Sequence, residues 1–355
     1  MLDPRTIQMM THETNEDLMN PVEVYTPCFP LENAFKLITK CPDIETFRWF
    51  RRFSEVGRFM LTTEFSPKKM DIYAKGNVIY KRDVDEAAFI EGRRVLQTLN
   101  GEQRLIVEGR FISSLLDRRV ATLTGDFQLP VALQNIISNN FLMDAGAARS
   151  MASLVRLMPM RITSGEVISI ELNRRNTLDA IVSLIQDNGI GLRTRFNAEN
   201  RTLDIEFYEP TPSVAIFDKE FGNVLEQDYW DDTENFKNVV YVGDTFTYNN
   251  NITGFERREV FASEPTGGST FLTQTARETL NRHRATTTLQ SVIDAGSKQF
   301  EYLKDWNIGS RILSQNRDIG FSQHEVVTEI LEFYDETGLN IEASTGSYIS
   351  RGGAS

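Results

Sequence analysis

Residues 324–328 begin like the metal-binding motif of zinc proteases, with His324 followed by Glu325. That motif needs a second histidine four residues after the first, so that both imidazoles bind Zn²⁺ from one face of a helix. This chain has Thr328 at that position, and the segment has the pattern of a strand. We therefore predict neither a metal ion nor a catalytic group there.

Phosphate-binding and nucleophile motifs are also missing. Gly189-Ile190-Gly191 lacks the third glycine of a dinucleotide-binding loop and follows a predicted helix instead of preceding one, so we interpret it as a helix stop. No P-loop and no G-x-S-x-G sequence occurs. The histidines and cysteines are widely spaced: His12, His283, His324, Cys28 and Cys41. A Cys–His nucleophile would have to be assembled by the fold, and nothing local indicates one.

The composition favours a globular protein that does not grip nucleic acid. The chain has 355 residues, 40% apolar and 25% charged, enough for a large core and roughly two to four domains. Its formal net charge of -12 argues against binding phosphates. Two interpretations of the acidity stay open: it aids solubility, or it forms a negative wall past which DNA slides. With 50 acidic residues some carboxylates must lie close together, so glycoside cleavage by such a pair stays open too.

The compartment is indicated by the cysteines and the N-terminus. Two cysteines cannot form a disulfide framework or a four-thiolate zinc site, which points to folding in a reducing cytoplasm. Residues 1–5 lack the basic and apolar regions of a signal peptide. No apolar run approaches the roughly 20 residues that span a bilayer. We expect synthesis in a cytoplasm and no membrane span.

The elements that would position any site begin with a predicted antiparallel sheet. Phe59, Leu61 and Thr63 share one face of a strand because side chains alternate with a period of two. The chain then predicts strands at residues 88–96 and 104–108, a tight hairpin at Asn100-Gly101 and a helical cap at residues 112–119.

Helical periodicity appears after this sheet. Pro130 suits a first helical position, and apolar residues at helical spacing continue to Phe141. Thr177 is predicted to cap a second helix, which Gly189 ends. Strands are expected at residues 167–172, 192–196 and 202–207. These elements predict an α+β block from about residue 120 to residue 212.

After Pro210 and Pro212 the pattern returns to strands. The apolar run at residues 236–243 is typical of a strand buried on both faces. Leu272, Ala276 and Leu280 predict a helix whose other face is either solvated or contacts an acidic partner through Arg277, Arg282 and Arg284. Further strands are expected at residues 214–217, 224–230, 255–261, 302–308, 311–315 and 326–333.

Several short motifs occur in an order that resembles the tail-hub proteins of long-tailed bacteriophages, and more narrowly the siphophage tail proteins related to the baseplate hub. They are residues 49–53, 55–59, 91–96, 105–110, 115–119, 217–224, 237–242 and 302–309, with a late strand from Glu325. Ser310 stands where relatives often have an aspartate, which weakens one motif. The resemblance covers about residues 44 to 346.

The resemblance implies an α+β, mainly β fold with two β-barrel-like domains of the tail-tube type and an inserted α+β domain. It also implies a homotrimer whose paired barrels match a six-fold tail tube. The expected domains are a flexible or docked arm at residues 1–20, a first hub domain at 21–119, the inserted α+β domain at 120–212, a second hub domain with a helical insertion at 213–346 and a mobile tail at 347–355.

The implied function is structural. The protein would cap the tail tube at the virion tail tip, link it to the tail tip or baseplate and form the conduit for DNA ejection. Implied partners are the distal tail or tail-tube protein, the tape-measure protein and tail-fibre or receptor-binding proteins, with viral DNA passing through without specific binding. No catalytic, cofactor-binding or metal-binding residue is expected, and we expect a channel that is net negative or neutral.

Two other functions stay open. One is a tail-tip hydrolase of cell-wall peptidoglycan or surface glycan, and the other is a receptor-binding module. The chain ends soon after the last motif, so we expect little room for an added hydrolase domain.

Overall fold

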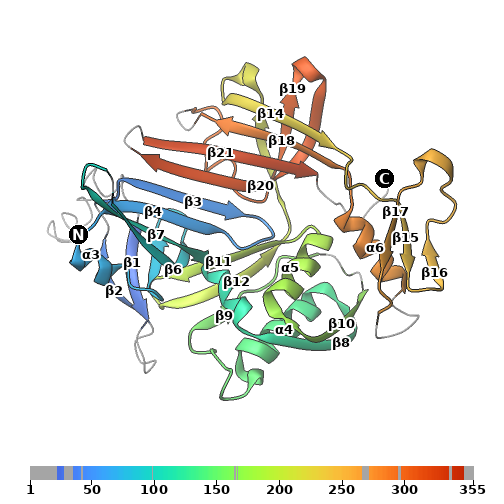
Figure 1. The fold of residues 1–355 in the computed structure, drawn as a ribbon, viewed down its shortest axis with the longest axis horizontal. Coiled ribbons are helices and arrows are strands. Elements are labelled where there is room, and N and C mark those ends of the chain that lie inside the picture. The colour runs from blue at the N-terminus through green and yellow to red at the C-terminus, as the bar shows by residue number, and fades with distance from the viewer. Residues whose placement is uncertain are drawn as a thin grey trace, which may run out of the picture.

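The computed structural model is mainly β, as Figure 1 shows. It describes residues 22–27, 35–40, 43–97, 99–163, 165, 167–265, 272–294, 297–335 and 338–347. The arm expected at residues 1–20 and all but the first residue of the tail expected at 347–355 lie outside the described residues, as do His12, Cys28 and Cys41.

Among the described residues, sixteen strands form one mixed sheet and two smaller sheets stand apart from it. The large sheet contains β1 (Val22–Pro27), β2 (Phe35–Lys40), β3 (Thr46–Arg52), β4 (Arg58–Glu64), β5 (Val78–Lys81), β6 (Glu86–Gln97), β7 (Gln103–Phe111), β9 (Val155–Leu157), β11 (Gly191–Asn197), β12 (Thr202–Tyr208), β13 (Thr211–Phe217), β14 (Val224–Asp232), β18 (Thr286–Ile293), β19 (Ser310–Asn316), β20 (Phe321–Asp335) and β21 (Gly338–Ser347).

The smaller sheets and the helices complete the fold. β8 (Val120–Gln128) pairs with β10 (Val167–Asn176), and β15 (Val239–Val242) lies between β16 (Phe246–Tyr248) and β17 (Glu259–Ala262). The α-helices are α3 (Pro67–Ile72), α4 (Leu129–Phe141), α5 (Thr177–Asp187) and α6 (Leu272–Arg282). The 3-10 helices are η2 (Ile112–Arg118), η3 (Met143–Ala145), η4 (Lys219–Phe221), η5 (Gly254–Glu256) and η7 (Arg317–Ile319). None of the described helices is long and apolar enough to cross a membrane.

The expected antiparallel sheet in the first part of the chain is confirmed, with strand order β3-β4-β7-β6. Along β3, Phe47 and Trp49 are buried whereas Arg48 is exposed, because side chains alternate between the two faces. The β6–β7 hairpin turns at Gly101, whose φ of 84° is easily adopted by glycine. The expected helical cap follows β7 as η2.

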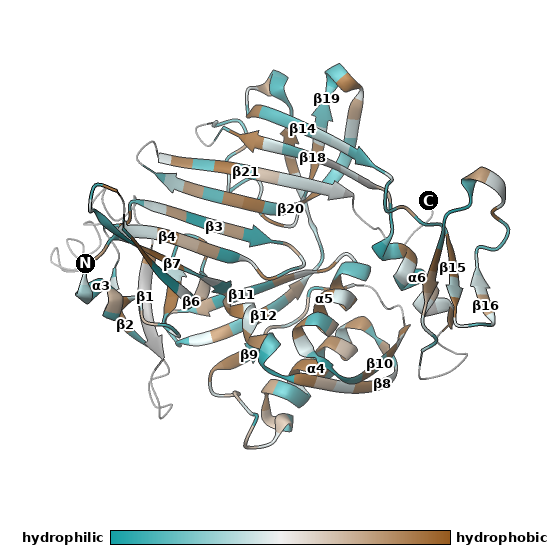
Figure 2. Ribbon diagram, viewed as in Figure 1, coloured by the Kyte–Doolittle hydropathy of each residue, from teal (hydrophilic) through white to brown (hydrophobic). Residues whose placement is uncertain are grey.

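The α+β block also forms, and it shares a hydrophobic core with the first sheet. One cluster of buried side chains combines Tyr80 and Phe89 from that sheet with Leu133, Ile181 and Phe207 from the block. Figure 2 shows hydrophobic residues on α4, α5 and the strands beside them. The β11–β12 hairpin also joins the large sheet through a contact of β11 with β6. The domain boundaries at residues 120 and 212 stay a prediction.

The long strand β20 belongs to both halves of the molecule. Its first residues pair with β19, its later residues pair with β3, and β21 runs along its other side. A bulge between Val327 and Glu329 lies where β19 gives way to β3. As a result, β14-β18-β21-β20-β3-β4-β7-β6 form one continuous run of strands (Figure 1).

The expected fold class is confirmed, but the β-barrel-like halves are not closed. Following the strand pairs among the described residues never leads back to the starting strand. The large sheet therefore has open edges, including β14 at one end of its longest path. Strands need two neighbours to satisfy all their backbone groups, so these edges stay available for pairing.

Three local predictions were wrong. Residues 302–308 form turns with one Tyr302–Trp306 bridge instead of a strand, because their polar side chains turn toward a buried arginine described below. Asn176, not Thr177, caps α5, since its side chain accepts from the N–H groups of Leu178 and Asp179. The apolar run at residues 236–243 is a strand only at β15, because its first residues lie in a loop.

The strand expected at residues 255–261 is also mostly irregular. Only β17 pairs there, and η5 occupies the earlier residues.

Gly109 lies where β7 passes very close to β6. A Cβ atom built on it would lie 1.8 Å from the carbonyl oxygen of Phe89 and 3.0 Å from the ring of Phe59. We predict that Gly109→Ala lowers the free energy of unfolding by about 3 kcal/mol, the upper end of the cost of overpacking, in urea denaturation. Gly165→Ala is the control, because its Cβ would meet only the Gln128 side chain, 3.9 Å away. Equal effects of the two substitutions would contradict the close approach.

Candidate functional site

Among the described residues, those that could have formed a metal or nucleophile site do not converge. His324 is exposed on β20, and the Thr328 hydroxyl donates to the carbonyl oxygen of Ser344. Within the described ranges, no group of three histidine, cysteine, aspartate or glutamate side chains could hold a metal ion. The helix stop is confirmed, since Gly189 follows α5 with a φ of 64°.

β3 instead places two consecutive arginines on opposite faces of the sheet. Arg51 is 1% exposed and points to the same side as Trp49, whereas Arg52 is half-buried on the other side. Each arginine organises one part of the candidate site. We call these parts the charge network, around Arg51, and the junction pocket, around Arg52.

Arg51 is held by a bidentate ion pair. Its Nε and Nη2 donate to the two carboxylate oxygens of Glu86 at 2.8 and 2.6 Å, and the indole of Trp49 donates to the same carboxylate at 3.1 Å. Its Nη1 donates to the hydroxyl of Tyr302 at 2.7 Å and to Oδ1 of Asn307 at 2.6 Å. These bonds fix a turn of the second half against β3 and β6 of the first.

A second ion pair completes the charge network. The side chains of Lys81 and Glu332 are both 0% exposed, and their Nζ and Oε2 atoms are 2.7 Å apart. Glu332 also accepts hydrogen bonds from the hydroxyls of Tyr302 at 2.7 Å and Tyr334 at 3.0 Å. Lys81 forms a further ion pair with Asp83. Strands β3, β5, β6 and β20 thus meet around four buried charges.

The pKa shifts in the charge network follow from burial and from its opposite charges. Burial raises the pKa of Glu332, but Lys81 and Arg51 outweigh it, so the net pKa is lowered and the carboxylate is ionised. Burial also raises the pKa of Asp83, against the opposing charge of Lys81. Charges removed from water are costly unless each keeps its partner.

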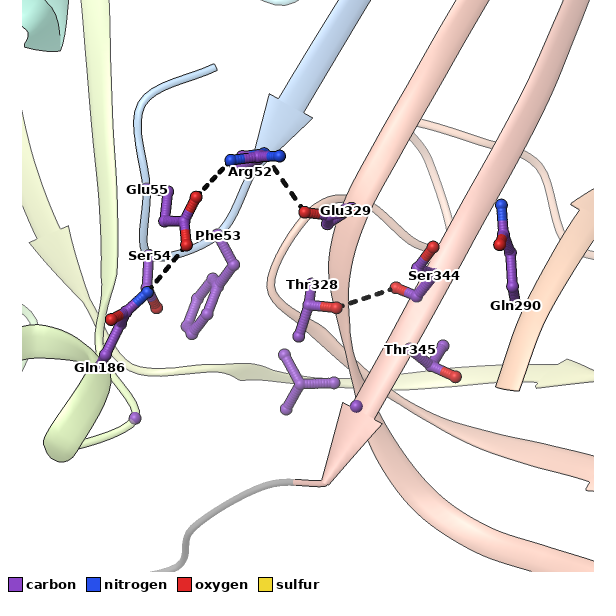
Figure 3. Close-up of a pocket in the computed structure, with 13 residues that line it drawn as sticks. Arg52, Phe53, Ser54, Glu55, Gln186, Gln290, Thr328, Glu329, Ser344 and Thr345 are labelled. Carbon is purple, nitrogen blue, oxygen red and sulfur yellow. Dashed lines mark hydrogen bonds and ion pairs between the residues drawn. The ribbon is translucent and has the colours of Figure 1, made fainter. Parts of the chain in front are cut away.

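The junction pocket lies on the other face of β3 and has a volume of about 530 Å³ (Figure 3). The guanidinium of Arg52 bridges Glu55, on the loop after β3, and Glu329 on β20. Gln186 in α5 donates to Glu55 at 3.0 Å. The first sheet, the α+β block and the C-terminal strands therefore meet here. Other polar residues that line the junction pocket are Ser54, Gln290, Thr328, Ser344 and Thr345.

The junction pocket does not have the geometry of a glycosidase. Two catalytic carboxyls need room between them for the sugar, and in some enzymes for a water molecule. Here Arg52 contacts Glu55 and Glu329 together and stands between them (Figure 3). Burial raises the pKa of Glu329, while Arg52 opposes that shift. The arrangement can hold strands together and accept polar groups.

Glu325, next to the junction pocket, is buried without an ion pair among the described residues. Oγ1 of Thr345 lies 2.5 Å from its Oε2 and 2.7 Å from the carbonyl oxygen of Leu289. A hydroxyl has one hydrogen, so when Thr345 donates to Leu289 the carboxyl must supply the hydrogen of the other bond. Burial raises the pKa of Glu325, against the Thr345 and Ser314 hydroxyls, in keeping with a protonated carboxyl.

Sequence reasoning missed the charge network, although one signal was present. Arg51 is in phase with Phe47 and Trp49 on the buried face of β3, and Glu332 is in phase with Ile330 on β20. A charged side chain at a core position indicates a buried pair, because such residues are rarely buried alone. Its partner could not be found in this way, because Arg51 and Tyr302 are 251 positions apart.

A comparison with protein families shows to which family this chain belongs. A family model described as Siphovirus ReqiPepy6 Gp37-like protein matches residues 21–347. The chain belongs to this family. The resemblance to siphophage tail proteins is thereby confirmed. No curated protein matches the sequence.

Solved structures of phage tail proteins share the fold. The tail protein of Neisseria meningitidis MC58 has a TM-score of 0.59 at 14% identity, covering 92% of this chain and 96% of that one. The 43 kDa tail protein of prophage MuSo2 from Shewanella oneidensis has a TM-score of 0.57 at 11% identity, covering 91% and 97%. The prophage tail protein gp18 of Listeria monocytogenes EGD-e has a TM-score of 0.53 at 15% identity, covering 93% and 95%. At sequence identities this low, the structural similarity establishes a shared fold and nothing more.

We predict strong coupling between Lys81 and Glu332. Lys81→Met should lower the free energy of unfolding by about 3–5 kcal/mol, because it leaves a buried carboxylate without its main cation. Adding Glu332→Gln should cost less than it does in the wild-type chain, so a double-mutant cycle measured by denaturation should not be additive. Arg110→Ala, which breaks an exposed pair with Glu91, should cost at most about 1 kcal/mol. Additive losses would refute the coupling.

Glu325 makes a testable contribution to the pH dependence of stability. A carboxyl whose pKa is higher in the folded state binds its proton more tightly there, so it stabilises the fold below its unfolded pKa. That contribution falls as pH rises from the unfolded pKa through the raised folded pKa. We therefore expect Glu325→Gln to gain stability relative to wild type across this window. Denaturation curves over a pH series that stay parallel for the two proteins would contradict this.

Proposed function

We propose that the protein is a structural hub of a siphophage tail, which caps the tail tube and links it to the tail tip. The observation that carries this proposal is that the whole chain, and not one part of it, matches phage tail proteins. The family model spans residues 21–347, and the three tail-protein structures are themselves covered over 95–97% of their lengths. Little of the chain is left for a separate module with another role.

The internal construction supports a role in transmitting force between the two halves. β20 is shared by both halves, so the backbone hydrogen bonds of one sheet continue into the other. The charge network lies beside this crossing, and Arg52 clasps β20 from the opposite face through Glu329. A force applied to one half is therefore carried to the other through paired backbone and buried charges. A protein that joins a tail tube to a tail tip needs this continuity.

The proposed assembly is a homotrimeric ring around a conduit for DNA. The proposed partners are the distal tail or tail-tube protein, the tape-measure protein and tail-fibre or receptor-binding proteins. The net charge of -12 per chain supports passage of DNA without retention, because phosphates are held by basic surfaces. We expect the channel to be net negative or neutral, without a continuous track of lysine and arginine.

The proposed role requires no chemistry. It is supported by the placement of the polar groups, which join elements instead of surrounding a reactive centre. Arg51 joins Glu86 to Tyr302, and Arg52 joins Glu55 to Glu329. We propose these as structural residues of the hub.

Immunogold electron microscopy tests the proposed position. In virions that contain this protein, antibodies raised against it should label the distal end of the tail, because a hub lies where the tube meets the tip. Pre-immune serum provides the control. Label along the tube or on the capsid would refute the hub assignment, and absence of the protein from purified virions would refute a structural role in the tail.

A further inference from the structure

One run of strands in the large sheet carries two open edges of opposite character. The run β14-β18-β21-β20-β3-β4-β7-β6 begins at β14, which pairs only with β18 among the described residues. Near the other end, residues 91–97 of β6 pair with β7 on one side, while β5 reaches only residues 86–89 on the other. We infer that β14 of one copy pairs with this open part of β6 in the next copy. This inference rests on the proposed ring.

β14 is an exposed acidic strand with apolar side chains. Trp230 is 62% exposed and Leu225 61%, so the strand presents apolar surface to solvent. Consecutive residues from Asp228 to Asp231 are all exposed, so both faces of the strand are open. Within the described ranges none of its four acids forms a salt bridge; they are Glu226, Asp228, Asp231 and Asp232.

The open part of β6 carries two arginines and one glutamate, Glu91, whose carboxylate pairs with Arg110, and it has its own apolar residues. Arg93 and Arg94 occupy adjacent positions and so point to opposite faces of the strand. Val95 is 42% exposed and Leu96 44%. Neither arginine forms a salt bridge among the described residues, although Arg93 donates to the carbonyl oxygen of Met70. The segment thus offers cations and apolar contacts where β14 offers anions and apolar contacts.

A second copy of this chain fits the two edges better than an unrelated partner. Each edge carries what the other lacks: unpaired backbone groups, exposed apolar residues and opposite charge. Exposed edges of this kind invite pairing with another chain. Two different surfaces that bind each other make a head-to-tail contact, which generates a ring when the rotation closes. The edges lie near opposite ends of one run of strands, as such a ring requires.

The charges chiefly determine which edge meets which. Exposed ion pairs contribute little affinity, but like charges placed opposite one another cost several kcal/mol and exclude the wrong partner. β14 against β14 would oppose acid to acid, and β6 against β6 would oppose arginine to arginine. Only β14 against β6 pairs opposite charges, so the contact is head-to-tail.

Charge reversal on each edge tests this contact. The β14 variant is Glu226→Arg/Asp228→Arg, and the β6 variant is Arg93→Glu/Arg94→Glu. Each should weaken self-association of the full chain about a hundredfold, because like charges then face each other, as measured by analytical ultracentrifugation. The chain carrying both reversals should associate again, since the charges are complementary once more. Arg174→Glu/Arg175→Glu on β10, two exposed arginines in a sheet separate from both edges, is the matched control and should leave association unchanged.

Mixing the two single-edge variants gives a sharper result. In a mixture, every contact between unlike variants pairs opposite charges and every contact between like variants opposes like charges, so native mass spectrometry should show assemblies in which the two variants alternate, and no three-membered rings. Circular dichroism and urea denaturation show whether each variant stays folded. Rings that survive in each single-edge variant on its own would overturn the edge pairing and leave the proposed hub intact. A wild-type chain that stays monomeric throughout would overturn the proposed ring as well.

Discussion

The rest of the structure depends on one constraint: strand β20 runs from one half of the molecule into the other. Glu332 on β20 is completely buried beside β3, so it must have cations within reach. Lys81 supplies one cation in direct contact with Glu332. Arg51 supplies the other through the hydroxyl of Tyr302, which is hydrogen-bonded to both Arg51 and Glu332. A shift of β20 by one residue would turn Glu332 to the other face and remove the buried carboxylate that faces Lys81. The buried charges therefore specify the register in which the halves join.

The same crossing explains the organisation of the surrounding elements. Because consecutive side chains of a strand point in opposite directions, Arg51 and Arg52 clasp β20 from two sides. The turn at residues 302–308 gives up strand geometry so that Tyr302 and Asn307 can reach Arg51. Sheet and turn therefore hold each other in place. The open edges, β14 and residues 91–97 of β6, lie outside this locked centre, although β6 enters it through Glu86.

Much of the local structure followed from residue patterns. The period of two along residues 59–63, the glycine of the β6–β7 hairpin and the helical spacing after Pro130 each act through neighbouring residues, so they predict strands, a turn and a helix without knowledge of the fold. The order of short motifs led to the tail-protein family. Local pattern was misleading where a side chain had a distant or stronger partner, as at Tyr302 and at the Asn176 cap.

Only the tertiary structure decided which charges are buried and which edges stay open. The partners of Arg51 come from segments 35 and 251 positions away, and a pattern within one strand carries no information about such distances. β20 could be recognised as a strand, but its two successive neighbours depend on how the chain returns to the first sheet. The sequence by itself determined the elements and the family, because those arise from local periodicity and motif order. The charge network, the junction pocket and the two edges arise from long-range pairing, which exists only in the folded chain.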